Sequence, residues 1–478
     1  MRHTLPDPML SQLSELLATQ TGLYFPKERW DDLERGMAAA AHESVGTSAQ
    51  EYVRRILSAP LTHRQIEILA SHLTIGETYF FRDRQSFEAL EQHVFPALIR
   101  SRRDSERRLR IWSAGCSSGE EPYSIAMLLD RLLPDHEQWN ITILATDINP
   151  KFLRKAEEGV YGEWSFRNTL PWVKERYFKS GRQGRFEINP RIKKMVTFSY
   201  LNLADDVYPS LSNNTNAMDV IFCRNVLMYF TAELAEKIAG NLHRAIVGGG
   251  WLAVSPTEAS NTLFSRFSPV NFPGAMLYRK DATDGPQFAA IGYPNQAIDS
   301  APATLYSLPS LETPQPIEVP PAPGEKTGVQ FEALLREQDE PDILCAKARL
   351  CANQGRLAEA AGWCEKAITS DKLNPQSHYL LATIRQELGQ PGAAEQSLKR
   401  ALFLDPNFIL AYFALGNICL SQSRHREAER HFTNALALLR AHPQDEALPE
   451  SEGLTTGRLA DIIANVMASL PRTMEARA

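Results

Sequence analysis

Apolar residues between positions 8 and 100 recur at intervals of three and four, as in Ile66, Leu69, Ala70 and Leu73. Such spacing places apolar side chains on one face of a helix. Turn-forming residues at 21–22, 46–48 and 58–60 divide the region into several helices. The pattern therefore predicts an N-terminal helical domain over residues 1–100.

Short apolar runs alternate with helical stretches over residues 101–280. Four runs read as strands, namely "LRIWSAG" (109–115), "ITILATD" (141–147), "MDVIFCRN" (218–225) and "GGGWLAVS" (248–255). Strands separated by helices predict a mostly parallel, Rossmann-like α/β sheet that binds its ligand at the carboxyl ends of the strands. Within this region "RYFKSGRQGRFEI" predicts a hairpin around residues 181–184, part of a small antiparallel β subdomain over about residues 160–196.

The C-terminal part of the chain repeats itself with a period of 34 residues. Small residues interleaved with Leu, Tyr and Phe at this period are typical of tetratricopeptide repeats, rather than of a generic helical bundle. The registered positions are Ala348, Ala382 and Gly416; Gly355, Gly389 and Ser423; Ala360, Ala394 and Ala428; and Ala367, Ala401 and Ala435. We expect repeats over residues 336–445 and a capping helix or tail over residues 446–478. Residues 281–335 are rich in proline and predict an extended linker.

Composition adds limits to this multidomain α/β plus α prediction. A length of 478 residues fits two to four globular domains. The chain is 43% hydrophobic and 23% charged, and its net charge of -6 argues against general nucleic-acid affinity. No run of about 18 apolar residues or signal-peptide core is present, so we expect a cytoplasmic protein without membrane insertion. Six cysteines without a CxxC pair and eleven histidines without close ligand spacing predict no metal site.

The loop after the first predicted strand reads "SAGCSSGEEPYS" and is expected to approach a ligand closely, because Gly115 and Gly119 allow a sharp turn. It is neither GxGxxG nor a P-loop, which disfavours a nicotinamide or phosphate ligand. The second strand ends in Asp147, placed to accept hydrogen bonds from ribose hydroxyls. A ribose site without a phosphate cradle indicates an adenosyl ligand such as S-adenosylmethionine. Asp147 as a helix N-cap is the alternative, because "TDINP" also starts a helix well.

Four motifs in this order resemble the CheR family of chemotaxis receptor methyltransferases: "GETYFFRD", "WSAGCSSGEEPYSIAM", "ATDIN" and "IFCRNVLMYF". The resemblance covers roughly residues 10–280. It implies transfer of a methyl group from S-adenosylmethionine to glutamate side chains of a transmembrane receptor. The cytoplasmic helical domain of that receptor would be the partner.

The resemblance also implies a set of site residues. Arg82 and Tyr229 would lie near the acceptor carboxylate, whereas Phe80 and Phe81 anchor their segment between the helices and the sheet. Many relatives have Asn where this chain has Gly76, so one side-chain hydrogen bond is missing. The implied cofactor shell is Thr78, Arg82, Gly115, Glu121, Asp147, Asn202, Leu203, Arg224 and Asn225.

The implied chemistry needs no catalytic histidine or lysine. A glutamate with a reference pKa of about 4.3 is deprotonated near pH 7 and can attack the sulfonium methyl without a general base. Arg82 and Tyr229 suit an orienting role, as a cation and a hydroxyl donor. We expect Arg82 to contact the cofactor or the carboxylate oxygen that does not attack, because a tightly held oxygen is a poorer nucleophile.

Several features bear on how a substrate is found. The arginine-rich run "RSRRDSERRLR" (100–110) predicts a solvated connector or, as the alternative, a surface that steers an acidic receptor helix. Arg54, Arg55 and Arg64 are possible counterparts of the basic helix that contacts receptors in the family. The hairpin "SGRQGRF" is shorter than in relatives that grip a receptor tail, which puts tail tethering in doubt. The repeats predict a protein partner that the sequence does not name.

Two other functions remain open from the sequence. One is an adaptor, in which the repeats bind a partner and the methyltransferase fold is kept as a scaffold. The other is an enzyme that methylates a small molecule or another protein carboxylate. The β insertion and the repeats favour a macromolecular acceptor.

Overall fold

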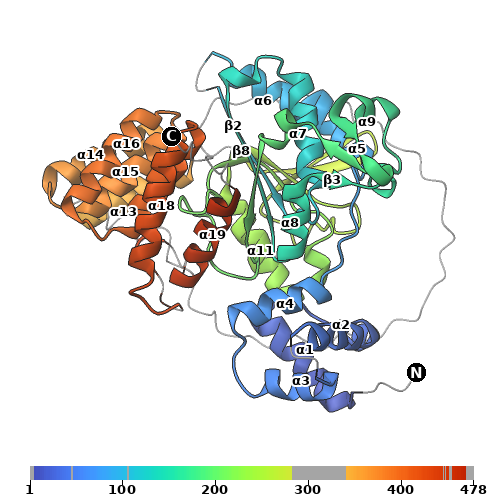
Figure 1. Ribbon diagram of the computed structural model, residues 1–478. Helices are drawn as coiled ribbons and strands as arrows, with labels where there is room; N and C mark the ends of the chain where they lie inside the picture. The colour runs from blue at the N-terminus through green and yellow to red at the C-terminus, as the bar shows by residue number, and fades with distance from the viewer. Residues whose placement is uncertain are drawn as a thin grey trace, which may run out of the picture.

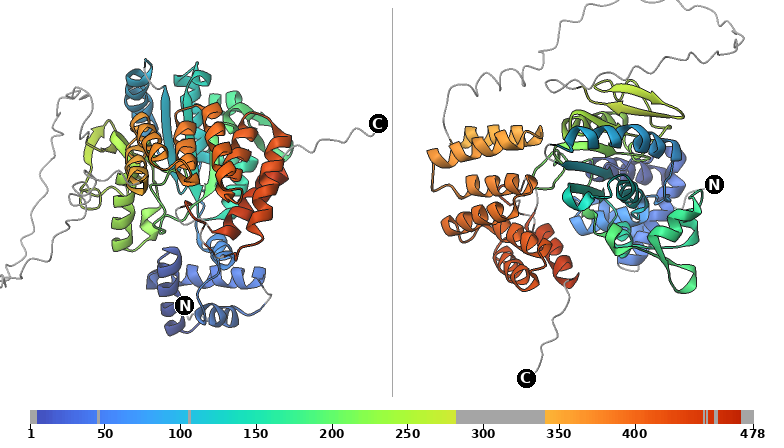
Figure 2. Two further views of the ribbon diagram at one scale, coloured as in Figure 1. Left: turned by 90° about the vertical axis from the view of Figure 1, so that its left-hand side faces the viewer. Right: turned by 90° about the horizontal axis from the view of Figure 1, so that it is seen from above.

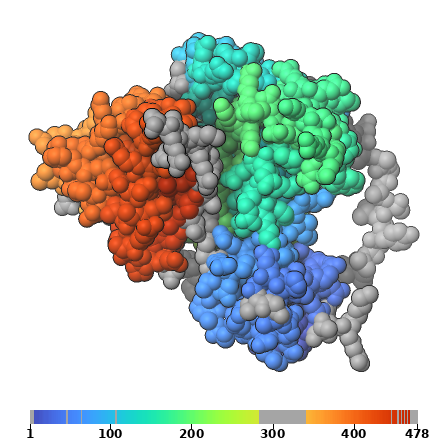
Figure 3. All heavy atoms as spheres, in the orientation of Figure 1, coloured from blue at the N-terminus to red at the C-terminus, as the bar shows by residue number. Residues whose placement is uncertain are grey.

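The computed structural model describes residues 5–44, 47–104, 107–281, 341–444, 446, 448–451 and 455–469. The predicted linker over residues 281–335 lies outside the described residues, except for Asp281. Figure 1 shows the N-terminal helices in blue at one end of the sheet and the repeats in orange and red along another side. Each of the three parts forms its own lobe in the space-filling view (Figure 3). Within the described part of the chain, no helix is long and apolar enough to cross a membrane.

The N-terminal lobe consists of α1 (Asp7–Thr21), α2 (Trp30–Ser44), α3 (Ala49–Leu57) and α4 (His63–Leu73). Leu10, Leu13 and Leu17 are fully buried along one face of α1, as their spacing requires. Ser48 caps α3 by accepting a hydrogen bond from the backbone of Glu51, and a capping box starts α4. α1 ends at Gly22 in the left-handed conformation.

A connecting segment then runs from the helical lobe to the sheet and continues as α5 (Arg84–Ala89), a π-helical turn (Leu90–Val94) and α6 (Phe95–Arg102). Phe80 is fully buried within it, with ring centroids 4.9 Å from Tyr161, 5.1 Å from Phe166 and 5.0 Å from Phe178. The ring of Phe81 packs on Phe87 at 5.3 Å. Both phenylalanines thus hold the segment against the sheet domain.

The main sheet has the strand order β6-β2-β1-β7-β8-β10-β9. Its first five strands pair in parallel and the last two are antiparallel. The strands are β1 (Arg108–Ala114), β2 (Asn140–Asp147), β6 (Val196–Tyr200), β7 (Met218–Phe222), β8 (Ile246–Ala253), β9 (Ser268–Phe272) and β10 (Ala275–Arg279). Every residue of β1 is buried, as expected for a central strand covered on both faces. The predicted fold class is confirmed.

Helices α7 (Glu120–Leu132), α8 (Pro150–Glu158) and α11 (Ala232–Ala245) connect strands of this sheet. The small antiparallel sheet has the order β3-β5-β4, with strands β3 (Val160–Tyr161), β4 (Phe178–Ser180) and β5 (Phe186–Ile188). Residues 181–185 join β4 to β5, at the predicted hairpin. The short helices α9 (Pro171–Tyr177) and α10 (Pro190–Lys193) flank it.

The repeats form three helix pairs, which we call the array. The helices are α13 (Pro341–Asn353), α14 (Leu357–Ser370), α15 (Pro375–Glu387), α16 (Pro391–Leu404), α17 (Ile409–Ser421) and α18 (His425–Leu439). Ala348, Ala382 and Gly416 are buried between helices, which explains why small residues recur there. α19 (Thr456–Ser469) follows and buries Leu459 and Ile463 in the apolar cluster of the last two pairs. Figure 2 shows the array beside the sheet domain from two further directions.

Candidate functional site

A pocket lies at the carboxyl ends of the parallel strands, where α1, the segment after α4 and the loops after β1, β2, β6 and β7 meet. Six of the residues predicted for the site line it: Gly115, Asp147, Asn202, Leu203, Asn225 and Tyr229. The other lining residues are Thr21, Leu23, Thr74, Ile75, Ser117, Ile148, Phe152, Leu201, Val226 and Phe230.

Gly115 is required where two loops of the pocket meet. Its φ is +79°, and a Cβ added there would lie 2.4 Å from Cγ2 of Val226. A larger residue would therefore push the loop after β7 away from the loop after β1, in addition to the strain of the left-handed conformation. The close approach leaves the backbone after β1 facing the pocket.

Asp147 ends β2 as a buried carboxylate. Its two oxygens accept hydrogen bonds of 2.8 Å from the backbone N–H groups of Ser117 and Asn149. Burial raises the pKa of Asp147 to about 6, and these hydrogen bonds oppose the increase. The N-cap of α8 is Asn149, whose side chain accepts from the N–H groups of Lys151 and Phe152. The alternative prediction that Asp147 is itself the N-cap is thus wrong.

Asn202 and Leu203 follow β6 and are both buried. The Asn202 side-chain oxygen accepts a hydrogen bond of 3.1 Å from the backbone N–H of Ala204. This contact fixes the start of the loop that leaves the pocket toward β7. The strand β6 that places both residues was not predicted from the sequence.

Arg224 and Glu121 lie beneath the pocket and do not line it. One Nη of Arg224 is 3.1 Å from Glu121, and the other is 3.3 Å from Asp83. Glu121 also accepts a hydrogen bond of 2.7 Å from Ser113 of β1. The buried guanidinium therefore joins the segment after α4, the start of α7 and the loop after β7.

Glu258 organises the loop that carries Asn225 and Tyr229, although the sequence analysis did not single it out. Its carboxylate accepts hydrogen bonds from the backbone N–H groups of Asn225, Val226 and Leu227 and from the Ser255 hydroxyl. Asn225 adopts a positive φ of 57°, which brings these successive N–H groups onto one acceptor. An isolated acid after a strand carries no signal of this role.

Arginine side chains bring positive charge to Tyr229 on the pocket wall. Its backbone carbonyl accepts from the N–H of Tyr24 at 2.9 Å, and the Arg29 guanidinium lies 5.3 Å from its ring centroid. Burial raises the pKa of Tyr229, while the charges of Arg29 and Arg82 oppose that increase. The phenol thus stays protonated at neutral pH and faces two cations. Arg29 was not predicted as a site residue.

Thr78 and Arg82 lie near the pocket but not among its lining residues. The Arg82 side chain donates to the carbonyl of Glu77, and the Thr78 carbonyl accepts a hydrogen bond of 3.4 Å from Arg167. Arg167 is in turn ion-paired with Glu77. Their segment therefore connects Thr74 and Ile75, which line the pocket, with Arg167 beside the small sheet.

Phe152 accounts for the missing asparagine at position 76. A Cβ added at Gly76 would lie 2.4 Å from the ring of Phe152, which lines the pocket. The aromatic ring occupies the space that a side chain at position 76 would need. The wall at this point is apolar as a result.

Residues 76–274 match the model of the CheR methyltransferase, SAM binding domain, and residues 330–377 and 379–446 match a tetratricopeptide repeat model. Chemotaxis protein methyltransferase 1 of Pseudomonas aeruginosa is 38% identical over 221 residues, which cover 45% of this chain and 77% of the relative. The chain belongs to the CheR methyltransferase family. It is a protein-glutamate O-methyltransferase that uses S-adenosylmethionine.

Two other relatives show how far the similarity extends. The chemotaxis protein methyltransferase of Borreliella burgdorferi is 31% identical over 52% of this chain and 87% of its own length. The probable biofilm formation methyltransferase WspC of Pseudomonas aeruginosa is 28% identical over 432 residues, covering 88% of this chain and 97% of the relative. The latter similarity includes the array.

The pocket fits S-adenosylmethionine by its chemistry. Asp147 would offer a buried carboxylate to ribose hydroxyls, and Gly115 would allow the backbone to approach a ligand. Leu201, Leu203 and Phe230 would offer apolar surface to a purine ring. The bound cofactor would supply an electrophilic methyl group.

Proposed function

We propose that this enzyme methylates glutamate side chains on the cytoplasmic helical domain of a chemoreceptor, in a chemosensory pathway. The observation that carries the proposal is that Tyr229, on the pocket wall, has the Arg29 guanidinium 5.3 Å from its ring centroid, while the charge of Arg82 also acts on its hydroxyl. Two guanidinium groups and a protonated phenol suit a carboxylate. Two similar proteins are named chemotaxis methyltransferases, which favours a receptor over other acceptors.

We assign the site residues by their positions. Gly115, Asp147, Asn202, Leu203 and Asn225 contact the cofactor directly, since all five line the pocket. Glu121 and Arg224 support the loops around it through their ion pair. Thr78 and Arg82 reach the cofactor or acceptor from the rim.

The reaction requires alignment rather than proton transfer. A deprotonated carboxylate oxygen of the acceptor forms a bond to the methyl carbon as the bond from that carbon to sulfur breaks, which gives a neutral ester and a neutral thioether. The protein's contribution is to hold the acceptor oxygen in line, and positioning of this kind is worth about 7–11 kcal/mol. Arg82 and Tyr229 hold the second oxygen.

The surface around Tyr229 favours a macromolecular acceptor. Tyr24, Ile75 and Met228 belong to the segments that meet there, and their exposures of 41%, 53% and 61% are high for such side chains. An exposed apolar patch beside an active site is typical of a protein-binding surface. Arg54 and Arg55 are exposed on α3 of the adjoining lobe, where they are placed to meet acidic residues of a receptor helix.

The test is methylation of receptor cytoplasmic domains from the same organism with radiolabelled S-adenosylmethionine. The proposal expects label that is released as methanol in mild base, as esters require, and that disappears when the acceptor glutamates are replaced by alanine. Label that resists base, or that remains on a receptor without those glutamates, would contradict the proposed acceptor. A scaffold without activity is disfavoured because the pocket and the Arg224 ion pairs are intact.

A further inference from the structure

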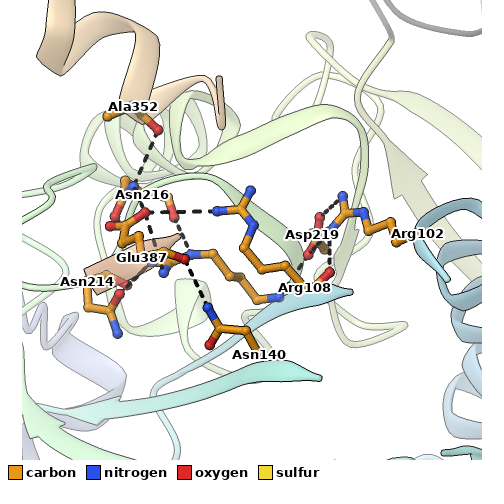
Figure 4. Close-up of polar contacts among 9 residues, drawn as sticks. Arg102, Arg108, Asn140, Asn214, Asn216, Asp219, Ala352 and Glu387 are labelled. Carbon is orange, nitrogen blue, oxygen red and sulfur yellow. Dashed lines mark hydrogen bonds and ion pairs between the residues drawn. The ribbon is translucent and has the colours of Figure 1, made fainter. Parts of the chain in front are cut away.

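The last arginines of the run 100–110 form neither a solvated connector nor a steering surface, the two roles predicted for this run. Arg108 and Arg110 are only 5% and 2% exposed, at the start of β1. Another arginine of the run, Arg102, forms an ion pair with the buried Asp219 of β7 (Figure 4). Arg108 and Arg110 both face α15 of the array.

Glu387, the last residue of α15, supplies the opposite charge. Its Oε2 atom is 3.9 Å from Nη1 of Arg108 and 3.8 Å from Nη1 of Arg110. The same oxygen accepts a hydrogen bond of 3.2 Å from Asn216, and the Glu387 carbonyl accepts one of 2.9 Å from Asn140 (Figure 4). Its side chain is only 8% exposed. Removing the Glu387 charge would leave the buried arginines without this opposite charge, which is costly in a buried contact.

The loop between β6 and β7 makes the apolar part of the same contact. Leu211 is 6% exposed and belongs to a buried cluster whose other members all come from the array, including Leu380, Leu381 and Ile384. The Arg110 guanidinium donates to the carbonyl oxygens of Asn214 and Asn216 at 3.0 and 3.1 Å. One arginine therefore holds both this loop and the array.

The other end of this loop lies in the cofactor pocket. Leu201, Asn202 and Leu203 line the pocket, and the Leu203 carbonyl accepts a hydrogen bond of 2.8 Å from the hydroxyl of Tyr208. The ring of Tyr208 packs edge-on against Trp112 of β1 at 5.3 Å. The loop thus crosses from the carboxyl edge of the sheet, where the pocket is, to the amino edge, where the array is bound.

We propose that the surface formed by Arg108, Arg110, Asn216 and Leu211 is the binding site of the enzyme's own array, and that this contact sets the affinity of the cofactor pocket. Docking of Leu211 orders the loop whose first residues line the pocket. A partner protein that binds the array and frees Leu211 would weaken cofactor binding. By linkage, bound cofactor would strengthen the contact of the array. The inference does not depend on which acceptor is methylated.

The test compares Glu387→Gln with Glu395→Gln in the full-length protein. Glu395 is a matched control, because it pairs with Arg424 and Lys399 inside the array. We expect Glu387→Gln to raise the Kd for S-adenosylmethionine about 5-fold or more, the lower range of such couplings. Hydrogen exchange of residues 201–217 should rise in the same variant. Glu395→Gln should match the wild type in both measurements.

A second variant guards against loss of folding. Leu211→Ser removes the apolar contact without a buried charge change, and its circular dichroism reports whether the protein is folded. Weaker cofactor binding with faster exchange of the loop in both folded variants supports the proposal. Faster exchange with unchanged affinity would overturn the coupling, and unchanged exchange in both would overturn the role of this surface.

Discussion

The carboxylate of Glu258 accepts a hydrogen bond of 2.7 Å from the backbone N–H of Val226, in the loop between Asn225 and Tyr229. The same carboxylate also accepts hydrogen bonds from the N–H groups of Asn225 and Leu227. Glu258 therefore fixes the conformation of this part of the pocket wall. Tyr229 is therefore positioned through a residue that touches neither cofactor nor acceptor in the proposed mechanism.

Glu258→Gln should weaken cofactor binding. The glutamine side chain would replace one carboxylate oxygen by an NH2 group, which cannot accept hydrogen bonds from the backbone N–H groups. Leaving a buried donor unsatisfied costs about 1–3 kcal/mol. We expect the Kd for S-adenosylmethionine to rise about 10-fold, measured by calorimetry. Glu236→Gln on the exposed face of α11 removes the same charge and should change nothing. Equal affinities in the two variants would contradict the role of Glu258.

Cofactor binding should depend on pH through Asp147. Its pKa of about 6 means that the carboxylate becomes protonated as the pH falls through 6, and ribose hydroxyls then lose an anionic acceptor. We expect the affinity to fall by up to tenfold for each pH unit below about 6. In Asp147→Asn, binding should be weak at pH 7.5 and nearly independent of pH. A wild-type profile that is flat from pH 5 to 7 would contradict this assignment.

The same pKa has a consequence for stability, with the opposite sign to that of a paired surface carboxylate. Because the folded protein holds this proton more tightly than the unfolded chain, its free energy of unfolding should fall as the pH rises from about 4 to 6. Relative to Asp147→Asn, the decrease should be at most about 3 kcal/mol. Urea unfolding of both proteins without cofactor measures the difference.

Tyr229→Phe should separate catalysis from cofactor binding. The phenyl ring keeps the pocket wall, whereas loss of a hydrogen bond to a charged acceptor costs about 1.5–3 kcal/mol. We expect kcat for receptor methylation to fall about 10- to 100-fold, with the Kd for S-adenosylmethionine unchanged. Arg29→Gln should instead raise KM for the receptor. A loss of cofactor affinity equal to the loss of kcat would contradict the role of Tyr229.

Phe80→Ala should destabilise the protein more than Phe81→Ala. Phe80 is fully buried among three aromatic rings, and such a truncation costs about 3–5 kcal/mol. Phe81 is only partly buried, so its truncation should cost less. Denaturant unfolding checks the order, and equal losses would contradict the packing described for Phe80.

The sequence predicts the parts of this fold that have a strong periodicity. The apolar runs of β1, β2, β7 and β8 are visible because burial within the sheet restricts residue type. The 34-residue repeat is visible because close packing of helices requires small residues at fixed positions. The strands β6, β9 and β10 were not predicted, since they lie at or near the sheet edges and carry many half-exposed residues. These five-residue segments lack the continuous apolar runs of the central strands, and β-propensity alone depends on neighbours across the sheet.

The site could be predicted only as far as its motifs reach. Gly115, Asp147 and Tyr229 stand in motifs that follow strands, and the structure brings them into one pocket. Thr21, Leu23 and Phe152 line the same pocket, but they come from α8 and from the end of α1 with the residues after it, whose approach depends on tertiary packing. Arg108 and Arg110 were read as solvated or steering residues because a charge run does not reveal a partner more than 270 residues away in the chain.

The shared use of Arg110 by the loop and the array has a consequence for how relatives of this enzyme diverge. An insertion or deletion in residues 204–216 changes the surface on which α13 and α15 rest, so loop and repeats must change together. We therefore expect that the array cannot be exchanged between family members without this loop. We expect a chimera that carries repeats from another family member to need the matching loop as well, and that loop begins directly after the pocket residues Leu201, Asn202 and Leu203.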